Sequence, residues 1–115
     1  MEVYGIPNCN TVKKALDWLK LNGVDFEFHD FKKQGISEDK LREWADELGW
    51  EALINKRGTT WKKLDLETQN SIVSPEAAFT LMQDKPSMIK RPVVESSNGL
   101  LAGFDEVNYK EVFIK

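Results

Sequence analysis

The sequence predicts an α/β (α+β) fold, in which a mixed sheet of about four strands carries helices and is interrupted by a helical insertion. The first observation is that residues 2–29 change from a strand pattern to a helix pattern and back again. The second is that residues 88–104 contain two strand-like runs joined by a turn. The third is that the residues between them, about 37–85, have mainly helical periodicity. The predicted order is therefore β-α-β, a block of helices, and β-β-α.

The N-terminal segment contains the clearest change of period. Residues 2–6 form a short apolar run that a Pro-Asn pair interrupts, which predicts a strand ending in a tight loop. A helix is expected over about 10–21, because apolar residues recur there at helical spacing and Asn22-Gly23 follows as a C-cap signal. Residues 24–29 then alternate between apolar and polar side chains. This order predicts two parallel strands joined by a right-handed crossover.

The insertion is expected to contain several helices. Two of them begin at Ser37-Glu38-Asp39 and at Ser74-Pro75-Glu76, where an N-cap residue precedes acids or proline in the first turn. Gly49 ends the first of these helices, and Pro86 ends the second. Between them we expect a short helical continuation over 50–54, a polar and basic loop over 55–63, and one more short helical turn within 64–72.

The C-terminal segment predicts a hairpin followed by a helix. Residues 88–95 are strand-like but contain Pro92, which has no N–H to donate and should lie at the first residue or the edge of the strand. Ser97-Asn98-Gly99 is a hairpin turn signal, and residues 100–104 form the return strand. Asp105-Glu106 then opens a last short helix.

The composition limits the number of domains and the classes of function. A chain of 115 residues is expected to form one domain over residues 1–115, because two cores would each have too few residues. Sixteen basic and nineteen acidic residues give a net charge of −3, which argues against nucleic acid as a partner. No apolar run approaches the ~18–20 residues that span a bilayer, and no signal-peptide pattern is visible. We therefore expect a cytoplasmic protein without a membrane partner, and a monomer.

Cys9 is the most informative residue of the sequence. It is the only cysteine and is accompanied by a single histidine, so neither an intramolecular disulfide nor a metal site is expected. Cys9 lies in the predicted strand-to-helix loop, just ahead of the first helical turn, where free N–H groups and the helix dipole favour an anion. We therefore expect the pKa of its thiol to lie below that of a free cysteine.

The neighbours of Cys9 favour a reactive thiol over the alternative, a small buried hydrophobic residue, which is the commoner role of a lone cysteine. Lys13 and Lys14 add positive charge one turn along the helix. Further hydrogen-bond donors or caps are offered by Asn8, Asn10 and Thr11.

Two other segments are candidates for anion binding. The bond between Arg91 and Pro92 is a candidate cis peptide, although only ~5–6% of such bonds in folded proteins are cis. Arg91 gains a role only if the fold brings it beside Cys9. The loop over 55–63 contains Arg57 among other basic residues and is equally well explained as an anion site or as a solvated surface. The four tryptophans are expected to pack rather than bind a ligand.

Two motifs of the sequence are residues 5–14, GIPNCNTVKK, and residues 89–94, IKRPVV. Together they resemble the arsenate reductase (glutaredoxin-type ArsC) family. Residues 50–61 are similar to the YffB branch of that family, and the related Spx regulators share the general layout. The resemblance covers essentially the whole chain, and the two motifs are more specific together than either is alone.

The resemblance implies a thioredoxin-like fold with a helical insertion. It also implies that Cys9 is catalytic and that Arg91, preceding a cis-Pro at Pro92, helps bind an oxyanion. The reaction of the family is thiol-dependent reduction, with glutathione and glutaredoxin as the electron source and no bound cofactor. Glutathione is thus the implied co-substrate, and glutaredoxin a possible partner.

The sequence departs from the family pattern at several positions. Arsenate reductases resemble His-Asn-Pro-x-Cys at the loop, but Gly5 stands where the histidine would be. A second family arginine falls near Asn55, where Arg57 is a possible substitute, and a third falls near Gly103, where no basic residue is present. Spx regulators have a Cys-x-x-Cys switch, whereas this chain has Val12 in place of the second cysteine.

Three functions follow from these observations. The first is a glutathione-dependent monothiol reductase, in which the Cys9 thiolate forms a mixed disulfide with a disulfide or an oxidised small substrate. Arg91, Arg57 and Lys13 would then hold the carboxylates of glutathione or an anionic substrate. The second is an Spx-like module that binds a protein such as an RNA polymerase subunit, without catalysis. The third, which the departures disfavour, is arsenate reduction with glutathione and glutaredoxin.

Overall fold

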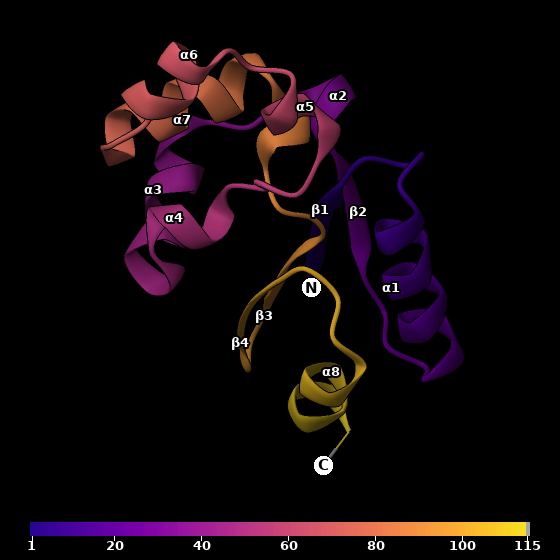
Figure 1. Ribbon diagram of the computed structural model, residues 1–115. Coiled ribbons are helices and arrows are strands. Elements are labelled where there is room, and N and C mark those ends of the chain that lie inside the picture. Colours follow the sequence, from indigo (N-terminus) through magenta and orange to yellow (C-terminus); the bar gives the residue numbers. More distant parts are fainter. Residues whose placement is uncertain (115) are drawn as a thin grey trace. The chain divides into compact units, whose positions relative to one another are not determined.

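The computed structural model describes residues 1–114 (Figure 1). In chain order, the elements are β1 (Glu2–Gly5), α1 (Asn10–Leu21), β2 (Glu27–Asp30), α2 (Phe31–Gln34), α3 (Glu38–Leu48), α4 (Trp50–Leu53), α5 (Thr59–Lys62), α6 (Leu66–Ser71), α7 (Pro75–Asp84), the 3-10 turn η1 (Pro86–Met88), β3 (Val93–Ser96), β4 (Gly99–Ala102) and α8 (Glu106–Phe113). They form two compact units, one of residues 1–34 with the chain from Arg91 onward, and one of residues 35–90. The helical insertion expected over about 37–85 falls within the second unit. None of the helices within residues 1–114 is long and apolar enough to cross a membrane.

The first unit contains a mixed four-stranded sheet with the strand order β2-β1-β3-β4. β1 and β2 pair in parallel, with Glu2 opposite Glu27, as the strand–helix–strand order predicts. β1 pairs antiparallel with β3, and β3 with β4 through the predicted hairpin. The predicted α/β class and the mixed sheet are therefore confirmed.

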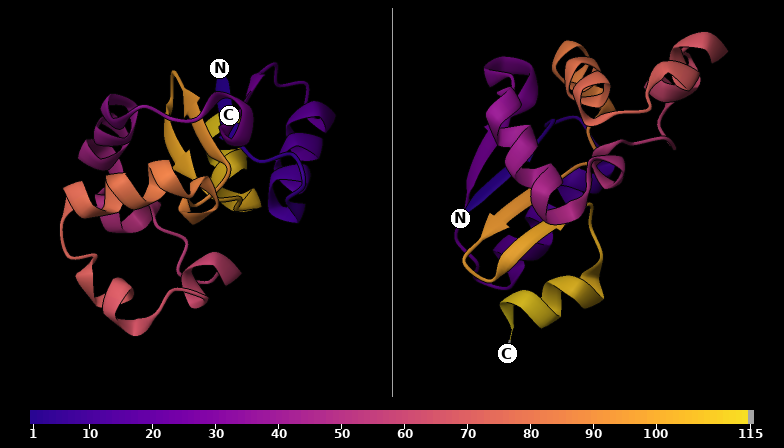
Figure 2. Two further views of the ribbon diagram at one scale, coloured as in Figure 1. Left: turned by 90° about the horizontal axis from the view of Figure 1, so that it is seen from above. Right: turned by 90° about the vertical axis from the view of Figure 1, so that its left-hand side faces the viewer.

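α1 and α8 bury one face of this sheet (Figure 2). The apolar stripe of α1 meets Val3 of β1 and Val94 of β3, and α8 contributes the buried ring of Tyr109. The indole of Trp18 lies edge-on to that ring, with 5.5 Å between the ring centroids. Burial of these apolar groups is the main stabilising contribution to the unit, because the burial of apolar surface dominates folding.

Several element boundaries differ from those expected. The strand expected over 88–95 is β3, which begins only at Val93, after the cis-proline, and the return strand expected over 100–104 is β4, Gly99–Ala102. β2 begins at Glu27 rather than at residue 24, because its partner β1 begins at Glu2 and leaves the earlier residues nothing to pair with. The short helix α2 was not predicted; it begins where Asp30 Oδ1 accepts a hydrogen bond of 2.9 Å from the N–H of Lys32. The prediction of a loop throughout residues 55–63 is wrong, since Thr59–Lys62 form the helical turn α5.

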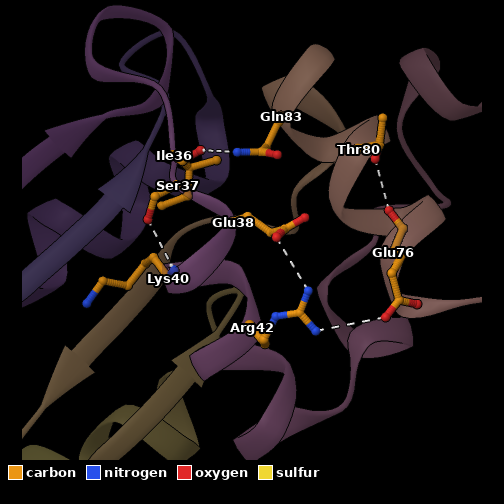
Figure 3. A network of polar contacts seen from close by, with 8 residues as sticks. All are labelled: Ile36, Ser37, Glu38, Lys40, Arg42, Glu76, Thr80 and Gln83. Atoms are coloured by element: carbon orange, nitrogen blue, oxygen red, sulfur yellow. Dashed lines mark hydrogen bonds and ion pairs between the residues drawn. The ribbon is translucent and has the colours of Figure 1, made fainter.

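The second unit is a group of helices, and a network of polar contacts joins α3 and α7 (Figure 3). Both predicted helix starts are confirmed, because Ser37 Oγ accepts from the N–H of Lys40 and Ser74 Oγ accepts from the N–H of Ala77. The guanidinium of Arg42 lies 3.4 Å from Glu38 and 3.9 Å from Glu76, and so joins α3 to α7.

Two of the four tryptophans are buried, and the other two are only partly buried. Trp44 is buried between the helices and Trp18 is buried in the sheet unit, as expected for packing residues. Trp50 and Trp61 are half-buried. Lys56 Nζ lies 5.3 Å from the centroid of the Trp61 ring, which is a cation–π distance.

Gly5, the last residue of β1, allows α1 to approach the sheet closely. A Cβ atom at this position would lie 3.0 Å from Cγ2 of Val12 and 3.5 Å from Cε1 of Phe28. Val12 is fully buried, so it has little freedom to move away. The close contact brings the end of β1 and the first turn of α1 together, and the loop that contains Cys9 joins the two.

We expect the substitution Gly5→Ala to lower the free energy of unfolding by about 1–3 kcal/mol, as overpacking of a core does. Urea denaturation would measure this loss. In a Val12→Ala background the added methyl group has room, so the same substitution should cost much less. An equal cost in both backgrounds would show that the contact with Val12 is not the cause.

Candidate functional site

Cys9 is the N-cap residue of α1. Its backbone is extended, with φ −119° and ψ 125°, and its carbonyl accepts a hydrogen bond of 2.9 Å from the N–H of Lys13. The thiol is half-buried and is not part of a disulfide. The backbone N–H groups of Thr11 and Val12 interact with the sulfur at the open end of the helix. A negative charge on the sulfur is stabilised there by these donors and by the helix dipole.

Arg91 reaches the same sulfur from the C-terminal half of the sheet unit. Its side chain hydrogen-bonds to Cys9 and adds an attractive charge. The register of β1 and β3 explains this meeting: continuing it past the pair Tyr4 and Val93 brings the residues just before β3 to the end of β1. The loop containing Cys9 begins at that end of the strand.

These groups lower the pKa of the thiol. Partial burial by itself raises the pKa of Cys9, because it penalises the charged form. The N–H of Val12, the hydrogen bond and charge of Arg91, and the N–H of Thr11 outweigh this penalty, so the pKa of Cys9 is lowered from its ordinary value. The arrangement can therefore present a thiolate nucleophile closer to neutral pH than a free cysteine does.

The backbone beside Arg91 is held by a short chain of hydrogen bonds. The Arg91–Pro92 peptide bond is cis. The carbonyl of Pro92 accepts a hydrogen bond of 2.8 Å from the N–H of Gly103, whose own carbonyl accepts one of 3.0 Å from the hydroxyl of buried Tyr109. Sequence reasoning missed the roles of Gly103 and Tyr109. The hairpin turn was the available signal, because its register places Pro92 opposite Gly103.

The other predicted site residues divide between the two units. Near Cys9 in the chain, the exposed residues are Asn8, Asn10, Thr11 and Lys13. Arg57 belongs to the unit of residues 35–90, where it is exposed in the turn before α5 and its N–H donates to Asn55 Oδ1 over 3.2 Å. Binding of an anion or of glutathione by these residues stays a prediction. Among residues 1–114 there is no cluster of three or more His, Cys, Asp or Glu side chains that could hold a metal ion.

This sheet order, with a cysteine at the start of the first helix and a cis-proline just before β3, defines a thioredoxin-like protein. The chain belongs to the ArsC family, whose sequence model matches residues 4–112.

Similar proteins agree with this assignment over nearly the full chain. An uncharacterised protein from Haemophilus influenzae is 39% identical over 111 residues, which is 96% of each chain. A solved structure of a protein called YFFB is 41% identical, with a TM-score of 0.90 and 96% of each chain covered. The global transcriptional regulator Spx of Streptococcus pyogenes is 29% identical over 102 residues, covering 87% of this chain and 75% of the regulator.

We expect the substitution Arg91→Gln to raise the pKa of Cys9, because it removes both the charge and a hydrogen bond to the thiolate. The rate of alkylation by iodoacetamide, measured against pH, reports this pKa. Lys90→Gln is the matched control, since it removes the same charge from the exposed neighbour of Arg91 and should leave the profile in place. Identical profiles for all three proteins would contradict the assigned contact.

The stability of the protein should also depend on the charge of Cys9. Because the pKa of the folded thiol is lowered, the thiolate stabilises the folded state fully above the pKa of the unfolded thiol, about 8.5. This contribution is lost as the pH falls through the lowered pKa of the folded state. The free energy of unfolding, relative to Cys9→Ser, should therefore rise with pH through this window and level off above it. A difference that is constant with pH would contradict the lowered pKa.

Proposed function

We propose that this protein is a glutathione-dependent monothiol reductase with Cys9 as its nucleophile. The thiolate of Cys9 attacks one sulfur of a substrate disulfide, so that a new S–S bond forms at Cys9 and the other sulfur leaves as a thiolate. A glutathione thiolate then attacks this mixed disulfide and releases Cys9. Glutathione supplies the electrons, and the released thiolates take up protons from water.

The single observation that carries the proposal is the environment of the Cys9 sulfur. Two backbone N–H groups and the guanidinium of Arg91 converge on a half-buried thiol and lower its pKa. A purely structural cysteine gains nothing from such donors, whereas a nucleophile needs the thiolate form at neutral pH. Membership of the ArsC family and the resemblance to arsenate reductases support thiol chemistry at this position.

The absence of a second cysteine supports the use of an external thiol. Cys9 is the only cysteine of the chain, so no second thiol of the same chain can resolve its mixed disulfide. Glutathione fits this role because its carboxylates can pair with cations. Arg91 and Lys13, with the polar groups of Asn8, Asn10 and Thr11, are the proposed binding residues of the sheet unit. Arg57 belongs to the unit of residues 35–90 and is proposed separately as an anion-binding residue. Glutaredoxin is a possible second electron donor.

Arsenate is a less suitable substrate than a disulfide for this site. A histidine in place of Gly5 would clash, because even a Cβ atom would lie 3.0 Å from Val12. Gly103, near the third family arginine, has a φ of 85°, which a residue with a side chain adopts only with strain. Among the described basic residues, Arg91 is the one whose charge lowers the pKa of Cys9. The arsenate reductase from Vibrio cholerae, at 21% identity, shares the fold.

Incubation with oxidised glutathione tests the first step. We expect intact-mass spectrometry to find one glutathione bound to the wild type and none to Cys9→Ser, and reduced glutathione to remove it. Arg91→Gln should form the adduct more slowly at neutral pH, because less of its thiol is ionised. No adduct on the wild type, or an adduct that glutathione does not release, would exclude the proposed cycle.

Turnover of arsenate with glutathione and glutaredoxin should be negligible beside reduction of a glutathione mixed disulfide by the same preparation. The physical reason is that a multiply charged oxyanion needs several cations around it, and arginine is the residue suited to that task. Arsenate turnover that matches the disulfide rate would reverse this ranking.

A second candidate is an Spx-like module that binds a protein partner. The observation that favours it is the similarity to Spx regulators over 87% of this chain. The position of the second Spx cysteine is occupied by Val12, which is fully buried against Gly5, so an internal disulfide switch is impossible here. The exposed basic residues of the 56–63 segment would be the contact surface.

Binding of purified RNA polymerase subunits, compared between the wild type and Cys9→Ser, separates the two candidates. Under the reductase proposal we expect no subunit to bind. Binding that persists in Cys9→Ser, and is lost when Lys62 and Lys63 are replaced by glutamine, would favour the regulator.

A further inference from the structure

A groove of about 340 Å³ lies beside the Cys9 loop, between α1 and the edge strand β2. Its walls are formed by Pro7, Lys13, Leu16, Asp17, Lys20, Phe26 and Phe28. The function proposed above uses only Lys13 of this set. The groove lies wholly within the unit of residues 1–34 and the chain from Arg91 onward.

The helical wall of the groove is a stripe of α1 that begins at Lys13, about one turn beyond the N-cap residue Cys9. Lys13, Leu16 and Lys20 follow Cys9 at steps of four, three and four residues, and this spacing places side chains on one face of a helix. A substrate whose disulfide lies at the sulfur of Cys9 can therefore continue along this face. On the opposite wall, Phe26 and Phe28 are two residues apart beside the edge of the sheet.

The groove continues to the far end of α1. A second hollow of about 450 Å³ shares Lys20, Phe26 and Phe28 with the first and extends to Gly23 and Asp25. The 12 residues of α1 span about 18 Å, which corresponds to about five residues of extended chain. This length exceeds what is needed to hold the glycine or glutamate arm of glutathione.

The chemistry of the groove also differs from that of glutathione. Leu16, Phe26 and Phe28 are only partly buried, and glutathione has no apolar side chain to cover them. Lys13 and Lys20 have no ion-pair partner among residues 1–114, and with Asp17 they give the hollow nearer Cys9 a net positive charge, whereas Asp25 lies in the second hollow. The complementary ligand is a peptide segment with an apolar side chain flanked by acidic ones.

We infer that this groove binds the protein part of a protein–glutathione mixed disulfide, as an extended segment with a large apolar residue near its cysteine and acidic residues beside it. The inference rests on the function proposed above and names its substrate class. The glutathione half would lie on the Arg91 side of Cys9, and the protein half along the Lys13–Leu16–Lys20 stripe.

The chemical step follows from this arrangement. The Cys9 thiolate attacks the glutathione sulfur, the S–S bond to the protein breaks, and the protein cysteine leaves as a thiolate that is protonated by water. Cys9 is then bonded to glutathione. A second glutathione thiolate attacks that bond, so that oxidised glutathione leaves and the Cys9 thiolate is restored. In the net reaction, the protein–glutathione mixed disulfide and one reduced glutathione give the free protein thiol and one molecule of oxidised glutathione.

Short S-glutathionylated peptides test the groove. The first has leucine near the cysteine and glutamate farther away on both sides, so that either chain direction can bind. In the second, serine replaces leucine, and in the third, lysine replaces glutamate. The mixed disulfide of glutathione with mercaptoethanol is the reference substrate, because it has no peptide to fill the groove.

We expect kcat/KM of the wild type to be about tenfold higher for the first peptide than for the second, because its leucine side chain is buried in the groove on binding and is removed from water. Lys20→Gln should reduce the preference for glutamate over lysine peptides by about threefold, as the loss of an exposed ion pair does. Lys14→Gln is the matched control. It removes the same charge from the same helix outside the groove and should change neither preference.

A binding measurement separates failure of the groove from failure of the reductase function. The same peptides with serine in place of cysteine are titrated into the Cys9→Ser protein and followed by NMR. Equal kcat/KM for all three peptides, without chemical-shift changes at Phe26 and Phe28, would contradict peptide binding in the groove and leave the proposed reductase function intact. Shifts at these residues without turnover of any disulfide would support the groove and exclude the reductase function.

Discussion

The contact between Arg91 and Cys9 is the interaction on which the rest of the site depends. Partial burial alone would raise the pKa of the thiol, because a half-buried anion is poorly solvated. Two backbone donors at the start of α1 offset part of this cost, and the guanidinium supplies both a hydrogen bond and a charge. The chemistry of the protein therefore depends on two residues that are more than eighty positions apart in the sequence.

The sheet explains how this contact is maintained. Antiparallel pairing of β1 with β3 brings Arg91 to the end of β1, and pairing of β3 with β4 brings Gly103 opposite Pro92. The hydrogen bond from Gly103 and the buried Tyr109 hydroxyl then fix the backbone next to Arg91. Each of these bonds is made by groups withdrawn from water, where a lost partner is costly. The position of the guanidinium is thus set by the core of the sheet unit.

The helix α1 serves the site in two ways. Its N-terminus stabilises the thiolate of Cys9, and the face that continues from Cys9 lines a groove beside the edge of the sheet. The other face buries Val12, Ala15 and Leu19. Gly5 permits the close approach of this buried face, and the same contact excludes a side chain where arsenate reductases have histidine. Under the proposed function, the packing that holds the helix in place therefore also disfavours an oxyanion relative to a sulfur substrate.

The sequence by itself determined the local structure and indicated Cys9 as the candidate nucleophile. Periodicity, capping residues and the Asn98-Gly99 turn predicted the helix starts, the parallel pair and the hairpin, because these depend on neighbours within a few residues. The environment of Cys9 at a helix start followed from the same local pattern. Short elements such as α2 and α5 were missed, because a helix of four residues is too short to show a clear periodicity of apolar side chains.

Only the tertiary structure decided what surrounds the thiol. The contact of Arg91 with Cys9, the support of Pro92 by Gly103 and Tyr109, and the groove lined by Phe26 and Phe28 all join distant parts of the chain. Strand register and helix packing create these contacts, and neither has a signature at the residues concerned. The physical reason is that burial and electrostatics depend on distances in space, which local sequence patterns do not specify.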